Sequence, residues 1–395
     1  MGLEGKTANK GEWAEIYVFL KLLGEGRLYA ADRHLEKKST SYVDVLKIIR
    51  EEIAKEISEY VRSDEGTTIE ILVKGETVAK VPASDFLDNA KMFFGHLSEM
   101  RGASNLASEE LVDFSRRIHI NKVKAPSLRT LGDYGGKTDI VIMTRDGRSA
   151  LVSTMGFSIK SQFASPPTLY NAGASTQFEF EIAGMDDAGM REFNDLDKTV
   201  KSKVWTAASA LYRDSGWEAR YIGTANSVTK ENFFLIRDSM PELMAWMYKR
   251  ALLESYPLAT PFTVLAQMAA TENPLGYPSG SMYEKVIKDF LFASFSGMTG
   301  AVPWNGMEQV NGGYIVVLPD GEVLCYHAND REAFRHYLFT QTHIEYVSRR
   351  KFKWGKIRKE PDGRFVLPLN GAARFYSRYR EVDEYVDRVA VNISV

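Results

Sequence analysis

Two apolar segments separated by a short polar turn constrain the fold of this chain more than any other feature. Residues 138–142 and 156–162 read as strands, and residues 145–148 between them have the composition of a turn. Such a pair brings the carboxylate of Asp139 and the ammonium group of Lys160 to one end of a sheet. An Asp on a strand can bind Mg²⁺, and the Lys can orient or deprotonate the attacking water and stabilise charge on a phosphorane. The two segments therefore predict a metal-dependent nuclease site.

The spacing matches the D…(D/E)xK core of many nucleases, with Ser158 in the place of the second acid. Ser158 and Lys160 share one strand face, because Phe157 and Ile159 alternate with them. Gln162 continues that face, where it could hold the scissile phosphate or a metal-bound water. In the structural alternative, Lys160 only extends from the edge of a strand into solvent. A string of this kind also occurs by chance, so the prediction depends on further features.

The first helix, expected over residues 11–24, offers the negative charge that Ser158 lacks. Apolar residues fill most of its circumference, so the carboxylates of Glu12 and Glu15 point toward apolar surroundings. An unpaired charge in such a place costs on the order of several kcal/mol and needs a compensating partner. For Glu12, in the first turn, the helix dipole or a buried pair with an Arg or Lys would be sufficient. Glu15 is the better candidate for a metal ligand or for an acid that positions water.

The region after the strand pair contains further candidates. Glu179 and Glu181 share one face of a third expected strand, at 177–182, and could serve as a displaced second ligand. A solvated strand face would explain at least one of them equally well. The loop at 165–176 is polar, braced by proline and rich in small hydroxyl residues, which suits a backbone that passes close to phosphates.

A basic run at residues 348–359 is the main local concentration of charge, although the formal net charge of the chain is -2. Phe352 and Trp354 interleave with its cations, and no acid occurs between Tyr346 and Lys359. This pattern favours DNA binding over an ordinary solvated surface. The side chains that we expect to contact DNA are Ser161, Asn171, Thr176, Arg349, Arg350, Lys351, Lys353, Lys356 and Arg358.

The composition excludes several other classes of protein. Cys325 is the single cysteine, which rules out a disulfide scaffold and a zinc module with cysteine ligands. The histidines lack metal-binding spacing, and no P-loop, dinucleotide fingerprint or nucleophile elbow is present. Residues 1–10 are polar, without the apolar region of a secretion signal, and no run is long enough to span a bilayer. We therefore expect a soluble protein of a reducing compartment.

The remaining pattern predicts a mixed α/β (α+β) fold in four regions. Residues 1–130 are expected to form a helical region with a β-hairpin, whose first helix packs on the core, and residues 131–230 to supply the core strands and the polar loop. Residues 231–312 are expected to form a second helical region, and residues 313–395 a β-rich basic region for DNA recognition. In the first region, residues 44–61 read as an amphipathic helix. Strands at 177–182 and 221–224 are expected to join the strand pair in the core.

Short blocks spread over the chain carry a family resemblance. They lie at residues 10–17, 137–140, 156–161, 167–178, 348–350 and 352–375. Together they resemble the HpaII-type type II restriction endonucleases, an SxK variant of the PD-(D/E)xK nuclease superfamily. The resemblance implies a core of a mixed β-sheet flanked by helices, with a helical insertion and a C-terminal β-rich extension. On this chain it marks Asp139 and Lys160 as catalytic, Glu15 as a second metal ligand and Gln162 as a further candidate.

The resemblance also implies an activity. Members cleave double-stranded DNA at a short palindrome, commonly CCGG, with Mg²⁺ as cofactor, in the cytoplasm of prokaryotes that carry a cognate DNA methyltransferase. We therefore expect Asp139 and Glu15 to bind Mg²⁺ and Lys160 to steer water onto the phosphorus, which leaves a 5′-phosphate and a 3′-hydroxyl. A palindromic target requires two active sites, so a homodimer is expected by symmetry.

Two other readings of the sequence stay open. The chain could be a DNA-binding protein without catalysis, in which Ser158 marks a decayed nuclease core and the basic run binds DNA. It could also be a nuclease for RNA or branched DNA. Metal-dependent turnover separates the first alternative from a restriction enzyme, and substrate competition separates the second.

Overall fold

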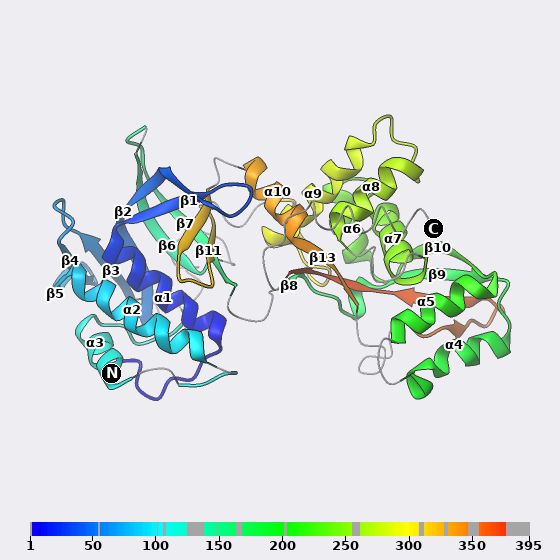
Figure 1. Ribbon diagram of the computed structural model, residues 1–395, viewed down its shortest axis with the longest axis horizontal. Coiled ribbons are helices and arrows are strands. Elements are labelled where there is room, and N and C mark those ends of the chain that lie inside the picture. The colour runs from blue at the N-terminus through cyan, green and yellow to red at the C-terminus, as the bar shows by residue number, and fades with distance from the viewer. Residues whose placement is uncertain are drawn as a thin grey trace. The chain divides into compact units, whose positions relative to one another are not determined.

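A computed structural model gives the fold of most of the chain. It describes residues 2–53, 56–100, 102–105, 108–124, 138–147, 149–162, 168–200, 204–254, 261–307, 312–327, 331–346 and 355–376. The chain divides into two units (Figure 1), which we call unit 1 (Met1–Pro167 with Glu308–Phe334) and unit 2 (Thr168–Met307 with Arg335–Val395). This division differs from the four regions expected from the sequence, because the strands at 313–327 pair with those of the N-terminal half.

Unit 1 is built on a nine-stranded sheet with the strand order β1-β12-β11-β7-β6-β2-β3-β4-β5. The bounds are β1 (Arg27–Ala31), β2 (Lys37–Ile53), β3 (Glu56–Arg62), β4 (Thr68–Val73), β5 (Glu76–Pro82), β6 (Ile140–Asp146), β7 (Val152–Ser161), β11 (Gly313–Val317) and β12 (Val323–His327). Neighbours are antiparallel except that β11 runs parallel to β7 and β12 runs parallel to β1. Strands β11 and β12 form an antiparallel hairpin, which extends the sheet that carries β6 and β7.

Three helices complete the described part of unit 1: α1 (Lys10–Glu25), α2 (Ala83–Glu99) and α3 (Glu109–Arg117). The helix expected over 11–24 is confirmed as α1. It begins at Asn9, which forms a capping box with Glu12, and it ends at Gly26, whose positive φ of 74° suits glycine. Figure 1 shows α1 and α2 side by side across one face of the sheet.

A single large core fills the space between α1 and this face of the sheet. Trp13 and Phe19 of α1 belong to the same buried cluster as Ile142 of β6 and Phe157 of β7. Burial of large apolar side chains on this scale is the dominant favourable term in folding. The core therefore fixes α1 across the strands that carry the two central candidate residues.

The helix expected over 44–61 is wrong, because this segment forms strands β2 and β3. Five consecutive side chains from Ile48 to Glu52 are buried in β2, which pairs with β3 on one side and β6 on the other. Arg50 and Glu52 occupy positions on the core side, so the alternation of apolar and polar residues that marks a strand is broken. The strand tolerates the two charges because they pair with each other and form hydrogen bonds with the backbone of Asn121 and Lys122.

Unit 2 contains two smaller sheets, with strand orders β10-β9-β15-β14 and β13-β16-β8. The strands are β8 (Thr168–Tyr170), β9 (Phe178–Ala183), β10 (Glu218–Thr224), β13 (Thr342–Tyr346), β14 (Arg358–Lys359), β15 (Phe365–Leu369) and β16 (Gly371–Phe375). The helices are α4 (Asp187–Thr199), α5 (Val204–Ser215), α6 (Ser227–Ile236), α7 (Met240–Lys249), α8 (Phe262–Glu272), α9 (Ser281–Phe295) and α10 (Arg331–Gln341), with short helical turns η2 (Ala174–Thr176) and η3 (Arg250–Glu254). Helix α10 begins in unit 1.

The strands expected at 177–182 and 221–224 exist as β9 and β10, but the expectation that they join the sheet of β6 and β7 is wrong. They pair with each other, and β9 continues to β15 in a separate sheet. Strands β9 and β10 therefore belong to unit 2, where Phe178 and Phe180 of β9 pack against Tyr221 of β10. Among the described residues, no helix combines the length and the apolar character that a membrane span requires.

Candidate active site

The carboxylate of Asp139 is fixed at the start of β6 by the neighbouring strand. Its backbone N–H donates to the carbonyl of Phe157 over 2.9 Å, which continues the β6–β7 ladder by one residue. Its Oδ2 atom accepts hydrogen bonds from the Ser158 hydroxyl, at 3.0 Å, and from the Ile159 N–H, at 2.7 Å. Ser158, which departs from the acidic residue of the motif, therefore orients Asp139.

Glu15 is held on the inner part of α1 with only 7% of its surface exposed. Its Oε2 atom is buried and makes no hydrogen bond within the described part of the chain. Burial raises the pKa of this carboxyl from 4.5 to about 8, and the negative charge of Asp139 adds to the increase. Lys124 and Arg50 act in the opposite direction. A buried carboxylate without a partner is costly, so this position calls for a cation.

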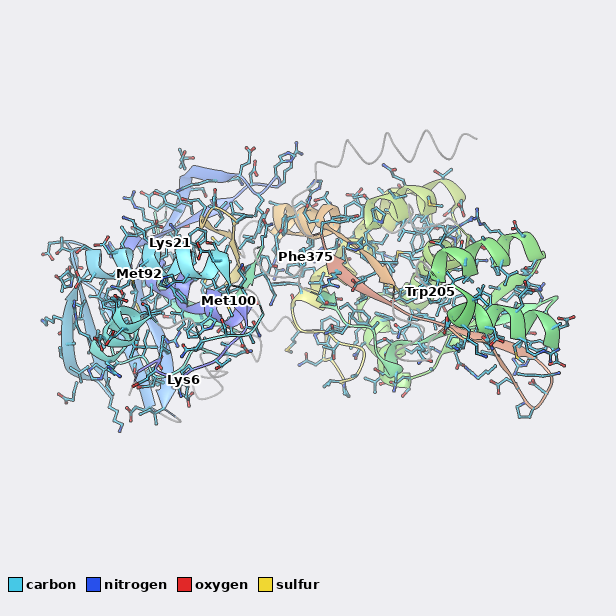
Figure 2. All side chains as sticks on the ribbon, turned by 60° about the horizontal axis from the view of Figure 1, so that its bottom comes forward. Lys6, Lys21, Met92, Met100, Trp205 and Phe375 are labelled. Carbon is cyan, nitrogen blue, oxygen red and sulfur yellow. The ribbon has the colours of Figure 1, made fainter. Side chains whose placement is uncertain are left out.

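Glu15, Asp139 and Lys160 line one pocket of about 690 Å³. The sheet end contributes Asp139 and Lys160, and α1 contributes Glu15 together with its first turn. The other lining residues are Asn9, Lys10, Gly11, Glu12, Met100, Gly102, Ala103, Lys124, Ile159 and Ser161. Met100, labelled in Figure 2, directly follows α2. The three residues that the sequence singled out from distant segments are therefore brought together.

The oxygen atoms of this pocket fit Mg²⁺. Among the described residues, no three His, Cys, Asp or Glu side chains gather as a metal cage. Mg²⁺ is usually bound through one or two carboxylates together with waters and substrate phosphates, so a full protein cage is not required. Glu15 and Asp139 supply two carboxylates, and the unpartnered Oε2 of Glu15 is available as a ligand.

The remaining expected residues of unit 1 take different positions. Ser161 lines the pocket, and its hydroxyl is buried without a hydrogen-bond partner among the described residues. Gln162 does not line this pocket, and its backbone N–H donates to the carbonyl of Val317. Glu12 accepts a hydrogen bond from the Asn9 N–H at 3.0 Å, so it takes part in the capping box at the start of α1.

Two of the cations expected to contact DNA, both in unit 2, form ion pairs within the protein. Lys356 pairs with Asp197 at 3.1 Å, and Arg358 pairs with Glu179 at 2.6 Å and with Glu360 at 2.5 Å. Two acids distant in sequence, Asp197 and Glu179, thus balance cations of the basic run, and the nearby Glu360 adds a second partner for Arg358. Arg349, Arg350, Lys351 and Lys353 lie outside the described residues. A role of all these cations in DNA binding stays a prediction.

The loop before β9 is held by its own polar side chains. Asn171 is exposed, as a DNA contact requires. Thr176 is 1% exposed, and its hydroxyl donates to Asn370 Oδ1 at 2.9 Å and accepts from the Gly173 N–H. Thr176 therefore shapes the loop from inside, in place of the direct DNA contact expected for it. Glu181, one of the alternative acids, lies 4.0 Å from Arg364.

Sequence reasoning missed three residues around the pocket. Lys124 lines it, and Arg50 and Glu52 form a buried ion pair whose influence reaches Glu15. The signals that could have found them are the lysines at 122 and 124, which follow α3, and the charged pair Arg50 and Glu52 inside the apolar segment at 44–61. Because a helix was expected over that segment, the contact of the pair with Lys122 was not anticipated.

The chain also matches known proteins. A model of the HpaII restriction endonuclease family matches residues 9–375. The type II restriction enzyme HpaII of Haemophilus parainfluenzae is 30% identical over 372 residues, which cover 93% of this chain and 98% of that protein. No solved structure matches the chain. With nearly its whole length matched, and with Glu15, Asp139 and Lys160 gathered in one pocket, the chain belongs to the HpaII restriction endonuclease family.

Proposed function

We propose that this protein is a type II restriction endonuclease that hydrolyses double-stranded DNA at a short palindrome in the presence of Mg²⁺. The observation that carries the proposal is the shared pocket of Glu15, Asp139 and Lys160, which come from α1, the start of β6 and β7. Family membership supports the class of activity. The target is CCGG or a related sequence, as the resemblance of the sequence blocks implies.

Each of the three side chains has a separate task in this proposal. Glu15 and Asp139 hold Mg²⁺, which when bound polarises a phosphate oxygen and neutralises developing charge. Lys160, half-buried on β7, orients the attacking water and stabilises negative charge on the phosphorus oxygens. Ser158 and the Ile159 N–H keep Asp139 in one orientation, so little reorganisation is needed during reaction.

The proposal includes the products and partners. Attack of water on phosphorus with departure of the 3′ oxygen leaves a 5′-phosphate and a 3′-hydroxyl. A palindrome presents the same phosphodiester on both strands, so a homodimer would place one pocket at each. The organism needs a DNA methyltransferase that protects the same sequence from cleavage.

The decisive assay is cleavage of unmethylated and methylated plasmid with Mg²⁺ or with EDTA, followed by sequencing of the fragment ends. We expect discrete fragments with a common end sequence only for unmethylated DNA with Mg²⁺. Asp139→Asn, Glu15→Gln and Lys160→Met should each lower the rate by roughly 10²-fold or more. Lys74→Met, on the exposed turn between β4 and β5, is the control for loss of a positive charge.

The outcomes separate the possible functions. Variants that cut as fast as the wild type would show that the pocket is not the active site. Sequence-specific retention of DNA without Mg²⁺-dependent cleavage would support a DNA-binding protein with a decayed core, the reading that Ser158 first suggested. Preference for RNA or branched DNA in a competition assay would replace the proposed substrate.

A further inference from the structure

A buried ion pair lies at the end of β2, behind the pocket. Arg50 is 2% exposed and Glu52 is 3% exposed, and Arg50 Nε donates to Glu52 Oε1. Burying two charges costs several kcal/mol per ion in rough terms, and the mutual attraction offsets that only if the remaining polar atoms are also satisfied. The important question is therefore which groups the pair holds.

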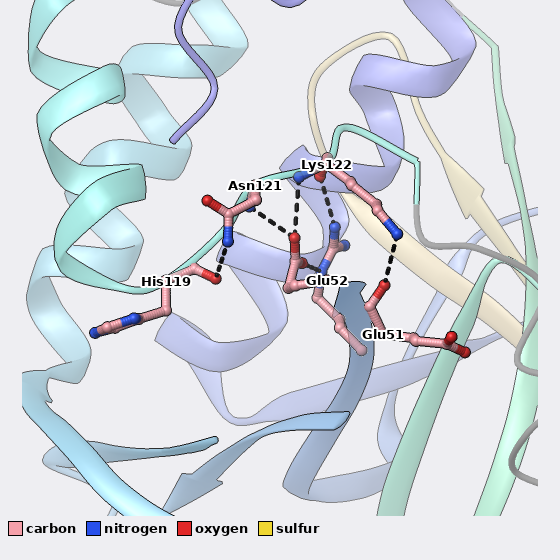
Figure 3. Close-up of polar contacts among 6 residues, drawn as sticks. Glu51, Glu52, His119, Asn121 and Lys122 are labelled. Atoms are coloured by element: carbon pink, nitrogen blue, oxygen red, sulfur yellow. Dashed lines mark hydrogen bonds and ion pairs between the residues drawn. The ribbon is translucent and has the colours of Figure 1, made fainter. Parts of the chain in front are cut away.

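The pair holds the chain segment that follows α3 (Figure 3). Glu52 Oε2 accepts hydrogen bonds from the backbone N–H groups of Asn121, at 2.7 Å, and Lys122, at 2.9 Å. Arg50 Nη2 donates to the carbonyl of Lys122 at 2.8 Å. The Lys122 ammonium group reaches back to the carbonyl of Glu51 at 3.4 Å. Three successive peptide groups, from Ile120–Asn121 to Lys122–Val123, are thus fixed to the end of β2.

The fixed segment leads to Lys124, which lines the same pocket as Glu15, Asp139 and Lys160. Lys124 is exposed, and it forms no ion pair within the described part of the chain. By contrast, the ammonium group of Lys10, another lining residue, donates to the carbonyl of Ser98. Lys124 therefore brings a positive charge to the pocket, two residues beyond a rigid anchor. This charge opposes the rise in the pKa of Glu15, but no ion pair with a described acid holds the ammonium group.

We propose that Lys124 binds a phosphate of the DNA strand next to the scissile bond, and that the Arg50–Glu52 pair is the positioning device that holds it there. The proposal rests on the proposed function. A phosphate is the anion that this substrate brings into the pocket, and a Lys acts on it as a point charge. The role of the pair is indirect, since Arg50 and Glu52 are buried and reach Lys124 only through the backbone at Asn121 and Lys122.

The first test measures binding without cleavage. Lys124→Met removes the charge and keeps a stem of similar shape. Affinity for a 20-base-pair duplex is measured by fluorescence anisotropy in EDTA at several salt concentrations. We expect the slope of log affinity against log salt to become shallower by about 0.9, with equal losses for target and non-target duplexes. Lys124→Arg should restore most of the slope, and Lys74→Met is the control.

An unchanged salt slope in Lys124→Met would overturn the phosphate contact, even if cleavage fell, because Lys124 would then act only through Glu15. Failure of the wild type to bind the duplex in EDTA would also overturn it. These measurements contain no Mg²⁺ and no turnover, so they stand apart from the cleavage assays of Asp139, Glu15 and Lys160 that test the proposed function.

The second test addresses the positioning role. Glu52→Gln keeps the shape of the side chain but removes the charge that attracts Arg50 and the two N–H groups. We expect it to weaken DNA binding several-fold in the wild-type background and to have little further effect in Lys124→Met, since both act through one contact. Equal effects in both backgrounds would show that the pair is merely structural.

Glu52→Gln could also compromise folding, so a milder variant accompanies it. Lys122→Gly leaves the buried pair intact and adds backbone freedom to the anchored segment. It should weaken binding in the wild-type background and leave Lys124→Met unaffected. Binding by Lys122→Gly equal to that of the wild type would refute the claim that the anchor positions Lys124.

Discussion

Replacement of Glu15 by glutamine measures how much folding stability the burial of this carboxyl group costs. The side chain is buried on α1, and its pKa is raised from 4.5 to about 8, mainly by burial and then by the charge of Asp139. Below pH 4.5 the carboxyl is neutral in both the folded and the unfolded chain. As the pH rises toward 8 the unfolded chain releases its proton first, so the folded state loses stability.

The magnitude follows from this shift. Stability falls by about 1.4 kcal/mol for each pH unit between the two pKa values, which gives an upper limit of about 3 kcal/mol at pH 7. Glutamine is neutral at every pH and nearly isosteric. Glu15→Gln should therefore be more stable than the wild type without metal at pH 7, while it loses Mg²⁺-dependent cleavage.

The assay is native-state hydrogen exchange of peptides from α1, followed by mass spectrometry in EDTA at pH 5.5, 6.5 and 7.5. The free-energy difference between variant and wild type should grow with pH, and saturating Mg²⁺ should stabilise only the wild type. Glu36→Gln, at an exposed turn position in unit 1, is the control and should change stability little at any pH. A difference that does not depend on pH would refute the reasoning.

Three further changes test other parts of the structure. Gly11→Ala places a methyl group in the pocket lining, 3.2 Å from Asn9 Oδ1; plasmid cleavage should fall, while thermal melting should show a stability change below about 1 kcal/mol. The control is Gly95→Ala, whose methyl group would have no atom within 4 Å, and it should leave cleavage unchanged. Burial raises the pKa of the Cys325 thiol to about 12, so a maleimide at pH 8 should modify it only after urea is added, as mass spectrometry would show; rapid labelling of the native protein would contradict this burial. Asn232→Ala removes three hydrogen bonds to the loop at 299–304 and should lower stability by about 2 kcal/mol, with faster amide exchange confined first to that loop; unchanged exchange there would show that the loop does not depend on them.

Several elements could be predicted from local pattern alone. The helix at α1 and the hairpin of β6 and β7 follow from periodicity and from turn and cap residues. The same patterns placed Asp139 and Lys160 on adjacent strands and Glu15 on the inner side of a helix. These predictions succeeded because neighbours in sequence determine which side of an element is apolar.

Other features depended on partners that are distant in sequence. Arg50 and Glu52 look like the polar face of a helix until Asn121 and Lys122 supply the hydrogen bonds that allow both charges to be buried in a strand. Lys356 and Arg358 look like free cations until acids from α4 and β9 pair with them. Strands β9 and β10 form a separate sheet because β9 pairs with β15, which is distant in sequence, and does not pair with β6 or β7.

The sequence by itself determined some of the local elements, such as α1 and the β6–β7 hairpin, and the identity of the three central pocket residues, because periodicity and residue chemistry are local properties. Only the tertiary structure decided which strands pair, how the buried charges are compensated and that Lys124 joins the pocket. The physical reason is that strand pairing and the compensation of buried charge are free energies of contact between segments, and one-dimensional spacing carries no measure of them.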